Sequence, residues 1–206
     1  MDSQVKMLFP HWPERVKWFV IGGPACELEA QAVHQQYPAV RCIGFEPNRD
    51  SAEWQRQHGF PGEVHPVALW ENDKDKLTLS IPTRGNDSGS VCRPENHPEQ
   101  WPYESFRSYP VDSATLDTLS DKLGPFEDAV LWLDIEYAEL PALRGAERLL
   151  DRTLMVNLET FHHRYLPEIN RLLDQHGLIL RMVWNIGRHA SGDAQDYLYV
   201  RKELWK

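Results

Sequence analysis

Three acidic side chains each end a short, mostly apolar run in this sequence: Glu46, Asp134 and Glu159. A carboxylate can accept hydrogen bonds from two hydroxyl groups at once, and in a partly dry site it can also take a proton from a reacting group. The chemistry within reach is therefore the binding of a polyhydroxylated ligand and acid–base catalysis. For Glu46, which precedes Pro47, a solvated charge in a turn is the simpler alternative.

Further potential ligands surround two of these acids. Asp134 and Glu136 are two residues apart, so on a continuing strand their side chains would share one face. Like charges close together in a dry cleft raise a pKa or recruit a cation. With Glu159, His162 and His163 they could form a divalent metal site or an acid–base cluster. Alternatively, Asp134 caps the following helix, and the histidines are solvated loop residues.

The elements that must position these residues follow from hydrophobic periodicity. Strands are predicted over 16–23, 40–46, 63–70, 76–82, 129–136, 153–159, 178–184 and 197–205. Helices are predicted over 26–37, 50–58, 113–124, 138–150 and 166–177, with Ser113 as an N-cap. Alternating strands and helices indicate a parallel sheet. The last two strands have no helix between them and should pair antiparallel.

This order predicts an α/β fold with an open, mostly parallel sheet that ends in an antiparallel hairpin. Ligands of such sheets bind outside the carboxyl ends of the strands, where the strand order reverses. The segment 83–110 breaks every period and is long for a compact domain, so it is a candidate substrate lid. Its hydroxyls Ser88 and Ser90 and its aromatics Trp101 and Tyr103 could contact an acceptor, or the segment could be a plain polar loop.

Composition restricts the function classes. A chain of 206 residues with 41% hydrophobic residues suits a single domain, residues 1–206. The formal net charge of -9 disfavours a nucleic-acid partner. The 3 cysteines, widely spaced, indicate no metal motif and fit a reducing compartment. We see no signal peptide and no apolar run of roughly 20 residues, so we expect a cytoplasmic protein without a membrane partner.

Four stretches resemble one family, in the order that the family has them. They are "VIGG", "IGFEPN", "VHPVALWENDKDKLTLSIP" followed by "NDSGS", and "LWLDIEYAELPALRGAERLL". In these stretches, which span about residues 16 to 160, the chain resembles the FkbM-type methyltransferases. The resemblance implies a Rossmann-like sheet of seven strands with helices on both faces, and S-adenosylmethionine as cofactor. It does not indicate an oligomeric state.

The resemblance also implies roles for particular residues. The cofactor would be held at the strand tips by Gly22, Gly23, Glu46, Pro47, Ala68 and Leu69. In the family, the acidic residue matching Glu46 accepts hydrogen bonds from both ribose hydroxyls. From their places at the ends of neighbouring strands, Asp134, Glu159 and His162 are the candidate catalytic residues, acting directly or through a divalent cation. His163 joins Ser88, Ser90, Trp101 and Tyr103 as a candidate substrate contact.

The chain departs from the family pattern in the glycine loop and after the fourth strand. Val20 and Cys26 stand where the pattern has aspartate and glycine, Pro24 withholds an N–H donor, and Tyr137 replaces a glycine. These changes remove a candidate anchor for the amino group of the cofactor and narrow the space near its methyl group. Two hypotheses follow: an O-methyltransferase acting on a hydroxyl of a sugar, glycan or other small metabolite, or a non-catalytic binding or regulatory module on the same fold.

Overall fold

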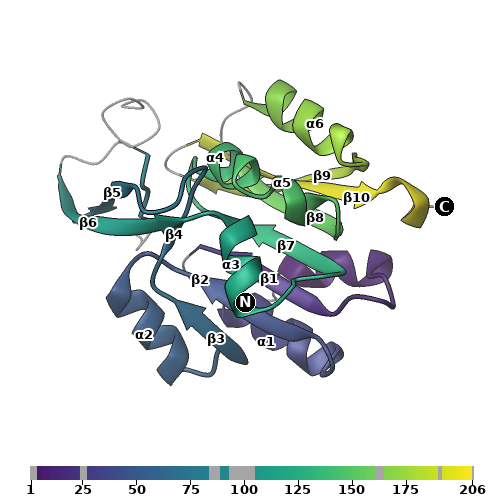
Figure 1. The fold of residues 1–206 in the computed structure, drawn as a ribbon, viewed down its shortest axis with the longest axis horizontal. Helices are drawn as coiled ribbons and strands as arrows, with labels where there is room; N and C mark the ends of the chain where they lie inside the picture. Colours follow the sequence, from purple (N-terminus) through teal and green to yellow (C-terminus); the bar gives the residue numbers. More distant parts are fainter. Residues whose placement is uncertain are drawn as a thin grey trace.

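A computed structural model of the chain describes residues 4–23, 27–83, 89–92, 105–160, 165–189 and 192–205. Its main sheet has seven strands in the order β3-β2-β1-β7-β8-β10-β9, with helices on both faces (Figure 1). Strand β10 runs antiparallel to both of its neighbours, and the pairs from β3 to β8 are parallel. The predicted mostly parallel sheet with a C-terminal antiparallel hairpin is confirmed.

The bounds of the elements are as follows. The main sheet contains β1 (Trp18–Gly22), β2 (Arg41–Phe45), β3 (Gly62–His65), β7 (Ala129–Leu133), β8 (Thr153–Thr160), β9 (Leu178–His189) and β10 (Gly192–Arg201). A second sheet contains β4 (Ala68–Leu69), β5 (Lys76–Pro82) and β6 (Phe106–Ala114). The helices are η1 (Gln4–His11), α1 (Glu27–Gln36), α2 (Arg49–Gln57), α3 (Leu116–Leu123), α4 (Glu139–Arg144), α5 (Glu147–Leu150), α6 (Leu166–Gln175) and η3 (Lys202–Leu204).

Two hydrophobic cores lie on opposite faces of the main sheet. One core joins the sheet to η1, α1 and α2, and the other joins it to α3, α4, α5 and α6. Strands β1 and β7 are buried at every position because helices cover both of their faces. This burial is why both strands are continuous apolar runs in the sequence.

The strand order reverses between β1 and β7. Strand β1 pairs with β2 on one side and with β7 on the other, so the connections that follow β1 and β7 leave the sheet toward different neighbours. Such a reversal opens a crevice at the carboxyl ends of the strands. The acids named above follow β2 and β7 and lie near the end of β8, at this same edge.

The second sheet was predicted only in part. The expected strand over 63–70 is divided at Pro66 into β3, which joins the main sheet, and β4, which pairs with β6. Proline has no N–H to donate and fixes its own φ, which favours a break there. The loop predicted over 83–110 ends earlier than expected, because β6 begins at Phe106 and pairs antiparallel with β5.

Several predicted boundaries differ in the structure: β7 ends at Leu133 instead of Glu136, and β9 extends to His189. Helix α3 is capped by Thr115, and Ser113 belongs to β6, where its hydroxyl donates to the carbonyl of Asn72. The helix expected over 138–150 is divided at Gly145 into α4 and α5, and Gly145 packs so closely on Trp70 that a Cβ would lie 2.2 Å from the Trp70 carbonyl oxygen. The last strand begins earlier than expected and ends at Arg201.

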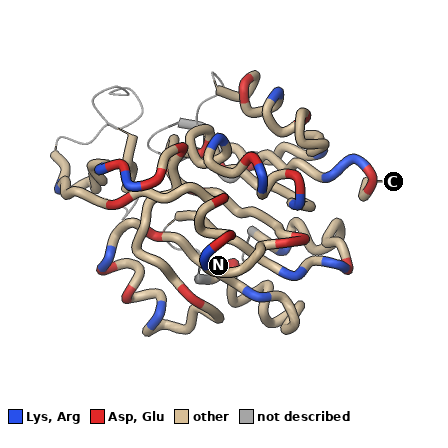
Figure 2. The backbone as a smooth tube through the Cα atoms, in the orientation of Figure 1, with Lys and Arg blue, Asp and Glu red and all other residues tan. Residues whose placement is uncertain are grey.

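Charged residues are distributed over the described surface. Figure 2 shows Lys and Arg interspersed with Asp and Glu along the helices and connections. None of the helices in the described ranges is long and apolar enough to cross a membrane.

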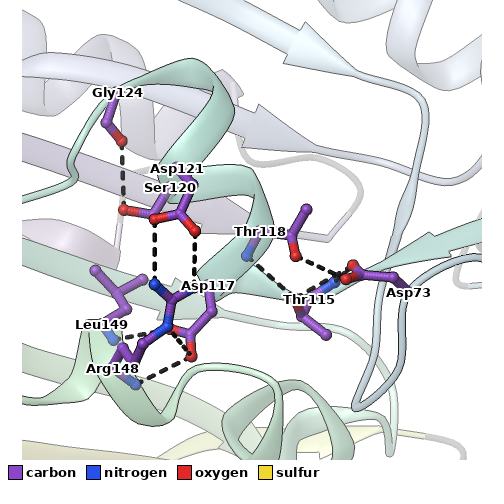
Figure 3. A network of polar contacts seen from close by, with 9 residues as sticks. All are labelled: Asp73, Thr115, Asp117, Thr118, Ser120, Asp121, Gly124, Arg148 and Leu149. Atoms are coloured by element: carbon purple, nitrogen blue, oxygen red, sulfur yellow. Dashed lines mark hydrogen bonds and ion pairs between the residues drawn. The ribbon is translucent and has the colours of Figure 1, made fainter.

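A polar network attaches the second sheet to α3. Asp73, in the connection between β4 and β5, accepts hydrogen bonds from the backbone N–H of Thr115 (2.8 Å) and the hydroxyl of Thr118 (2.6 Å). The hydroxyl of Thr115 in turn accepts the N–H of Thr118 at 3.1 Å. These bonds satisfy donors in the first turn of α3 that have no partner within the helix (Figure 3).

The same helix also holds α5. Both carboxylate oxygens of Asp117 accept backbone N–H groups, those of Arg148 (3.1 Å) and Leu149 (2.8 Å). The guanidinium of Arg148 pairs with Asp121 at 2.8 Å (Figure 3). Helix α3 therefore connects the second sheet to the helices that cover β7 and β8.

Replacing Thr115 with Ala tests this connection. The loss of the cap should lower the free energy of unfolding by about 1 kcal/mol, measured by urea denaturation. Thr115→Ser keeps a capping hydroxyl and should stay near wild type. Equal losses in the two variants would show that the methyl group of Thr115, and not its hydroxyl, stabilises the junction.

Candidate functional site

The turns after β1 and β7 touch at the centre of the crevice. The N–H of Asp134 donates to the carbonyl of Gly22 at 2.9 Å, and the N–H of Gly23 donates to the carbonyl of Phe45 at 3.1 Å. A Cβ on Gly23, whose φ is +121°, would lie 1.7 Å from the carbonyl oxygen of Asp134. One on Gly22 would lie 2.7 Å from a methyl group of Leu69. Glycine is therefore required here by the packing of the chain itself.

Glu46 lies at the end of β2 and is only 3% exposed. Its Oε1 accepts the N–H of Asn48 at 2.7 Å, and its Oε2 is buried without a hydrogen-bond partner in the described part of the chain. Burial raises the pKa of Glu46 to about 7, with a further contribution from the charge of Asp134, while the Asn48 bond opposes the shift. A solvated turn charge is therefore the wrong interpretation of Glu46.

A small cavity lies beside the orphaned oxygen of Glu46. Its lining includes five of the six predicted cofactor-binding residues: Gly23, Glu46, Pro47, Ala68 and Leu69. Its other walls come from Phe45, Ile135 and Ala138 and from Leu79, Gly89 and Val91 beside the second sheet. The cavity volume is about 20 Å³, which is room for a single water molecule. The apolar lining with one unpaired carboxylate oxygen fits a nucleoside in chemistry, and a nucleoside would need walls of this cavity to move apart.

Asp134 and Glu159 form a hydrogen-bonded carboxyl pair. Leu133 and Leu158 are partners in the β7–β8 ladder, so the residues that follow them lie side by side. Burial and the neighbouring charges raise the pKa values of both carboxyl groups above their usual range, and the hydrogen bond between the two side chains opposes the shift of Asp134. Two close carboxyls cannot both be ionised easily, so the arrangement favours a proton shared within the pair. The structure thus brings together two of the three predicted catalytic residues.

Glu136 does not share a strand face with Asp134, as the spacing predicted. Strand β7 ends at Leu133, and Glu136 and Tyr137 have positive φ angles of 51° and 77°. The hydroxyl of Ser90 donates to the carbonyl of Glu136 at 2.5 Å. The prediction failed because the backbone turns immediately after Asp134. The charge of Glu136 still contributes to the raised pKa of Glu159.

Ser90 and Cys92 hold this turn from the side of the second sheet. Ser90 is 1% exposed and forms a reciprocal backbone pair with Ser80, at 2.8 and 3.0 Å. The thiol of Cys92 donates to the carbonyl of Tyr137 at 3.3 Å. A substrate contact by the Ser90 hydroxyl stays a prediction, and in this structure that hydroxyl is used to hold the Glu136 turn.

Glu139 supports the turn from the other side. It lies in the first turn of α4 and is only 3% exposed. Its Oε1 accepts the N–H of Tyr137 at 3.2 Å. Burial, with the charge of Asp134, raises the pKa of Glu139 to about 8 although backbone hydrogen bonds oppose the shift.

Asp196 is an acid of this site that the sequence reasoning missed. It is opposite Glu159 in the β8–β10 ladder and is fully buried. The side-chain amide of Asn157 donates to Oδ1 at 2.8 Å, and Oδ2 has no partner within the described ranges. Burial raises the pKa of Asp196 to about 7. Asp196, Leu198 and Val200 are two residues apart, so their side chains lie on the same face of β10. The sequence prediction missed this alternation because it began the strand at Tyr197.

Several other predicted residues cannot be placed. Outside the described residues lie Pro24, Cys26, Ser88, Trp101, Tyr103, His162 and His163. Within the described ranges, no group of three or more His, Cys, Asp or Glu side chains is arranged to hold a metal ion. Val20, which replaces the aspartate of the pattern, is fully buried between Ile43 and Leu131 of the neighbouring strands. An aspartate at position 20 would therefore bury a charge in the sheet.

The buried acids predict an unusual dependence of stability on pH. The pKa values of Glu46, Glu139 and Asp196 are raised in the folded state, so that state keeps protons that the unfolded chain loses above about pH 4. The free energy of unfolding should therefore fall as pH rises from about 5 to 8. Glu139→Gln still accepts the Tyr137 N–H and should reduce this fall by about 1–3 kcal/mol.

Urea denaturation at several pH values measures this effect. Glu14→Gln, at an exposed position, is the matched control and should leave the slope unchanged. If Glu139→Gln also leaves the slope unchanged, Glu139 is already ionised in the folded protein at pH 5.

Three solved methyltransferases have a fold similar to that of this chain. Precorrin-6y C5,15-methyltransferase from Geobacter metallireducens superposes with a TM-score of 0.52 at 10% identity, covering 95% of this chain and 86% of that one. Magnesium protoporphyrin IX methyltransferase from Synechocystis, with bound S-adenosylmethionine, gives 0.50 at 11% identity, covering 97% and 77%. A putative tRNA (m1A22) methyltransferase from Streptococcus pneumoniae gives 0.51 at 10% identity, covering 98% and 71%. At these identities the likeness establishes the fold alone.

The sequence itself identifies the family. No curated protein matches the chain, but the pattern that defines the Methyltransferase FkbM domain matches residues 28–180. This range contains the Glu46 turn, the Asp134–Glu159 pair and all three strands of the second sheet. The chain belongs to the FkbM methyltransferase family.

Proposed function

We propose that this methyltransferase uses S-adenosylmethionine to methylate a hydroxyl group of a sugar, glycan or other small metabolite. The observation that carries the proposal is the buried, unpaired Oε2 of Glu46, in the same crevice as the Asp134–Glu159 carboxyl pair. The first can bind a hydroxylated cofactor, and the second can take the proton of an acceptor. A further support is the related fold of a methyltransferase that was solved with bound S-adenosylmethionine.

The cofactor would be held at the tips of β1 and β2 and at β4. Glu46 would accept ribose hydroxyls at Oε2, while Oε1 stays bonded to Asn48. Gly23, Ala68 and Leu69 would form the walls around it. When bound, S-adenosylmethionine supplies a methyl group on a sulfonium, which makes that carbon electrophilic. Making room requires Leu79, Gly89 and Val91 to move away from the strand tips.

The acceptor hydroxyl must lose its proton as its oxygen is methylated. Its own pKa is far above neutrality, so a base has to take the proton. With one shared proton, the Asp134–Glu159 pair still has a negative charge and can accept a second proton. The proton would pass from the acceptor oxygen to a carboxylate oxygen of the pair. His162 or a divalent cation could assist at this point.

The binding of S-adenosylhomocysteine tests the role of Glu46. Glu46→Gln keeps an acceptor for the Asn48 N–H but removes the charge, so affinity should fall by about 1.5–3 kcal/mol in calorimetry. Because the pKa of Glu46 is about 7, wild-type affinity should also weaken as pH falls from 8 to 6, and the variant should lose this dependence.

Glu53→Gln, on the exposed side of α2, is the control and should bind as wild type does. Equal binding by wild type and Glu46→Gln would reject the ribose assignment. No binding by either would favour the non-catalytic module.

Asp134→Asn tests the proposed base. The variant keeps the shape and hydrogen bonding of the side chain, so cofactor affinity should stay within a few-fold. Turnover should fall by about 10²–10⁴, measured as transfer of labelled methyl groups to a panel of sugars and polyols. Asp128→Asn, beside Lys17 at the opposite edge of the sheet, should keep full activity.

Wild-type turnover by Asp134→Asn would exclude Asp134 as the base. A rise of the rate through about pH 6–7 that is kept in Asp134→Asn would favour a histidine. Loss of activity with a chelator would favour a divalent cation at the pair.

A further inference from the structure

A second cavity lies between β5 and the helices α4 and α6. Its volume is about 480 Å³, within the range of small-molecule sites. Side chains from β5, from the segment 89–92, from α4 and from the start of α6 line it, and all of them belong to the described part of the chain. None of the residues predicted to bind cofactor or substrate is among them.

This cavity adjoins the proposed site of methyl transfer. Val91 lines both this cavity and the small one beside Glu46. Tyr137 lines the second cavity and follows Asp134 by three residues. The N–H of Tyr137 donates to Glu139, and the charge of Asp134 contributes to the raised pKa of Glu139. A ligand in this cavity would therefore contact the turn that leads directly from the carboxyl pair.

Tyr137 has a left-handed backbone conformation that glycine usually adopts and tyrosine rarely does. Its φ is +77°, a region in which a residue with a Cβ is disfavoured by about 1–2 kcal/mol and in which glycine is favourable. The side chain is 5% exposed and forms a wall of the cavity. Strained residues of this kind are concentrated at ligand sites, where the side chain has a function that glycine cannot supply.

The lining combines aromatic walls with paired charges. Trp70, Tyr137 and Tyr165 supply aromatic rings. The guanidinium of Arg144 is fixed by Glu168 at 2.6 Å and by Glu71 at 3.1 Å. Lys76, the other cation of the lining, pairs with Asp112, and Arg171 lies 3.9 Å from Glu168. Each charged group around the cavity therefore has a partner of opposite sign, and the lining has no excess of one sign that would select an ionic ligand. The lining thus combines aromatic residues with a guanidinium and a carboxylate that are fixed by ion pairs.

We propose that this cavity is the acceptor site and that it binds a neutral sugar ring. The apolar C–H face of the sugar would pack against the aromatic walls, and its hydroxyls would bond to Arg144 and Glu168. This proposal rests on the proposed methyltransferase function and names the place and the class of its acceptor. It assigns the acceptor to residues other than those that the sequence indicated.

Binding without cofactor tests the site separately from catalysis. The probes are neutral methyl glycosides, with glucose 6-phosphate and phenol as contrasts, followed by saturation-transfer NMR and calorimetry on the full chain. The neutral glycosides should bind best to the wild type. Tyr137→Gly removes the ring and the backbone strain, and Arg144→Gln removes the fixed donor at an exposed position. Each should weaken glycoside binding at least 10-fold while the affinity for S-adenosylhomocysteine stays within 2-fold.

Trp54→Ala is the control, since Trp54 is an exposed tryptophan on α2 that does not line the cavity. It should leave glycoside binding unchanged. Unchanged binding in both cavity variants, or no glycoside binding by the wild type, would overturn the proposal. Tighter binding of phenol or of the phosphorylated sugar would overturn the ligand class. If the wild type does not bind S-adenosylhomocysteine, the proposed function itself is rejected. Failure of the proposed function and failure of the proposed acceptor site are therefore distinguishable.

Discussion

The contact between the turns after β1 and β7 is the constraint on which the site depends. The Asp134 N–H to Gly22 carbonyl bond and the absence of a Cβ on Gly23 let these turns approach to van der Waals distance at the point where the strand order reverses. That contact ends β7 at Leu133 and places Asp134 beside Glu159 of the next strand. A side chain on Gly23 would separate the two strands and disperse the acids.

The acids at this edge are held at an energetic disadvantage. Burial raises the pKa values of five of them: Glu46, Asp134, Glu139, Glu159 and Asp196. Burying a carboxylate is unfavourable unless it is paired or protonated, and a stable fold has only a small margin for such groups. A proton shared within the cluster limits this disadvantage. It also leaves carboxyl groups poised to exchange protons near neutral pH, which is what an acid–base catalyst requires.

The second sheet connects the two cavities. The segment 89–92 pairs with β5 through Ser90, and it holds the Glu136–Tyr137 turn through Ser90 and Cys92. Since Val91 lines both cavities, a displacement of this segment that admits a cofactor would also reshape the proposed acceptor site. Cofactor and acceptor would then bind with coupled affinities, because both act on one structural element.

The sequence by itself determined the sheet, its hairpin, the burial of β1 and β7 and the edge at which Glu46, Asp134 and Glu159 lie, because periodicity and burial are local properties of a chain. It also indicated the family, through four short stretches. Tertiary structure decided the rest. The break at Pro66, the strand that begins at Phe106 and the division at Gly145 depend on pairing or packing with distant segments. Asp196 belongs to the acidic cluster because it is paired with Glu159, which lies 37 positions earlier in the sequence. The register between two strands is set by contacts across the sheet, which no local sequence pattern contains.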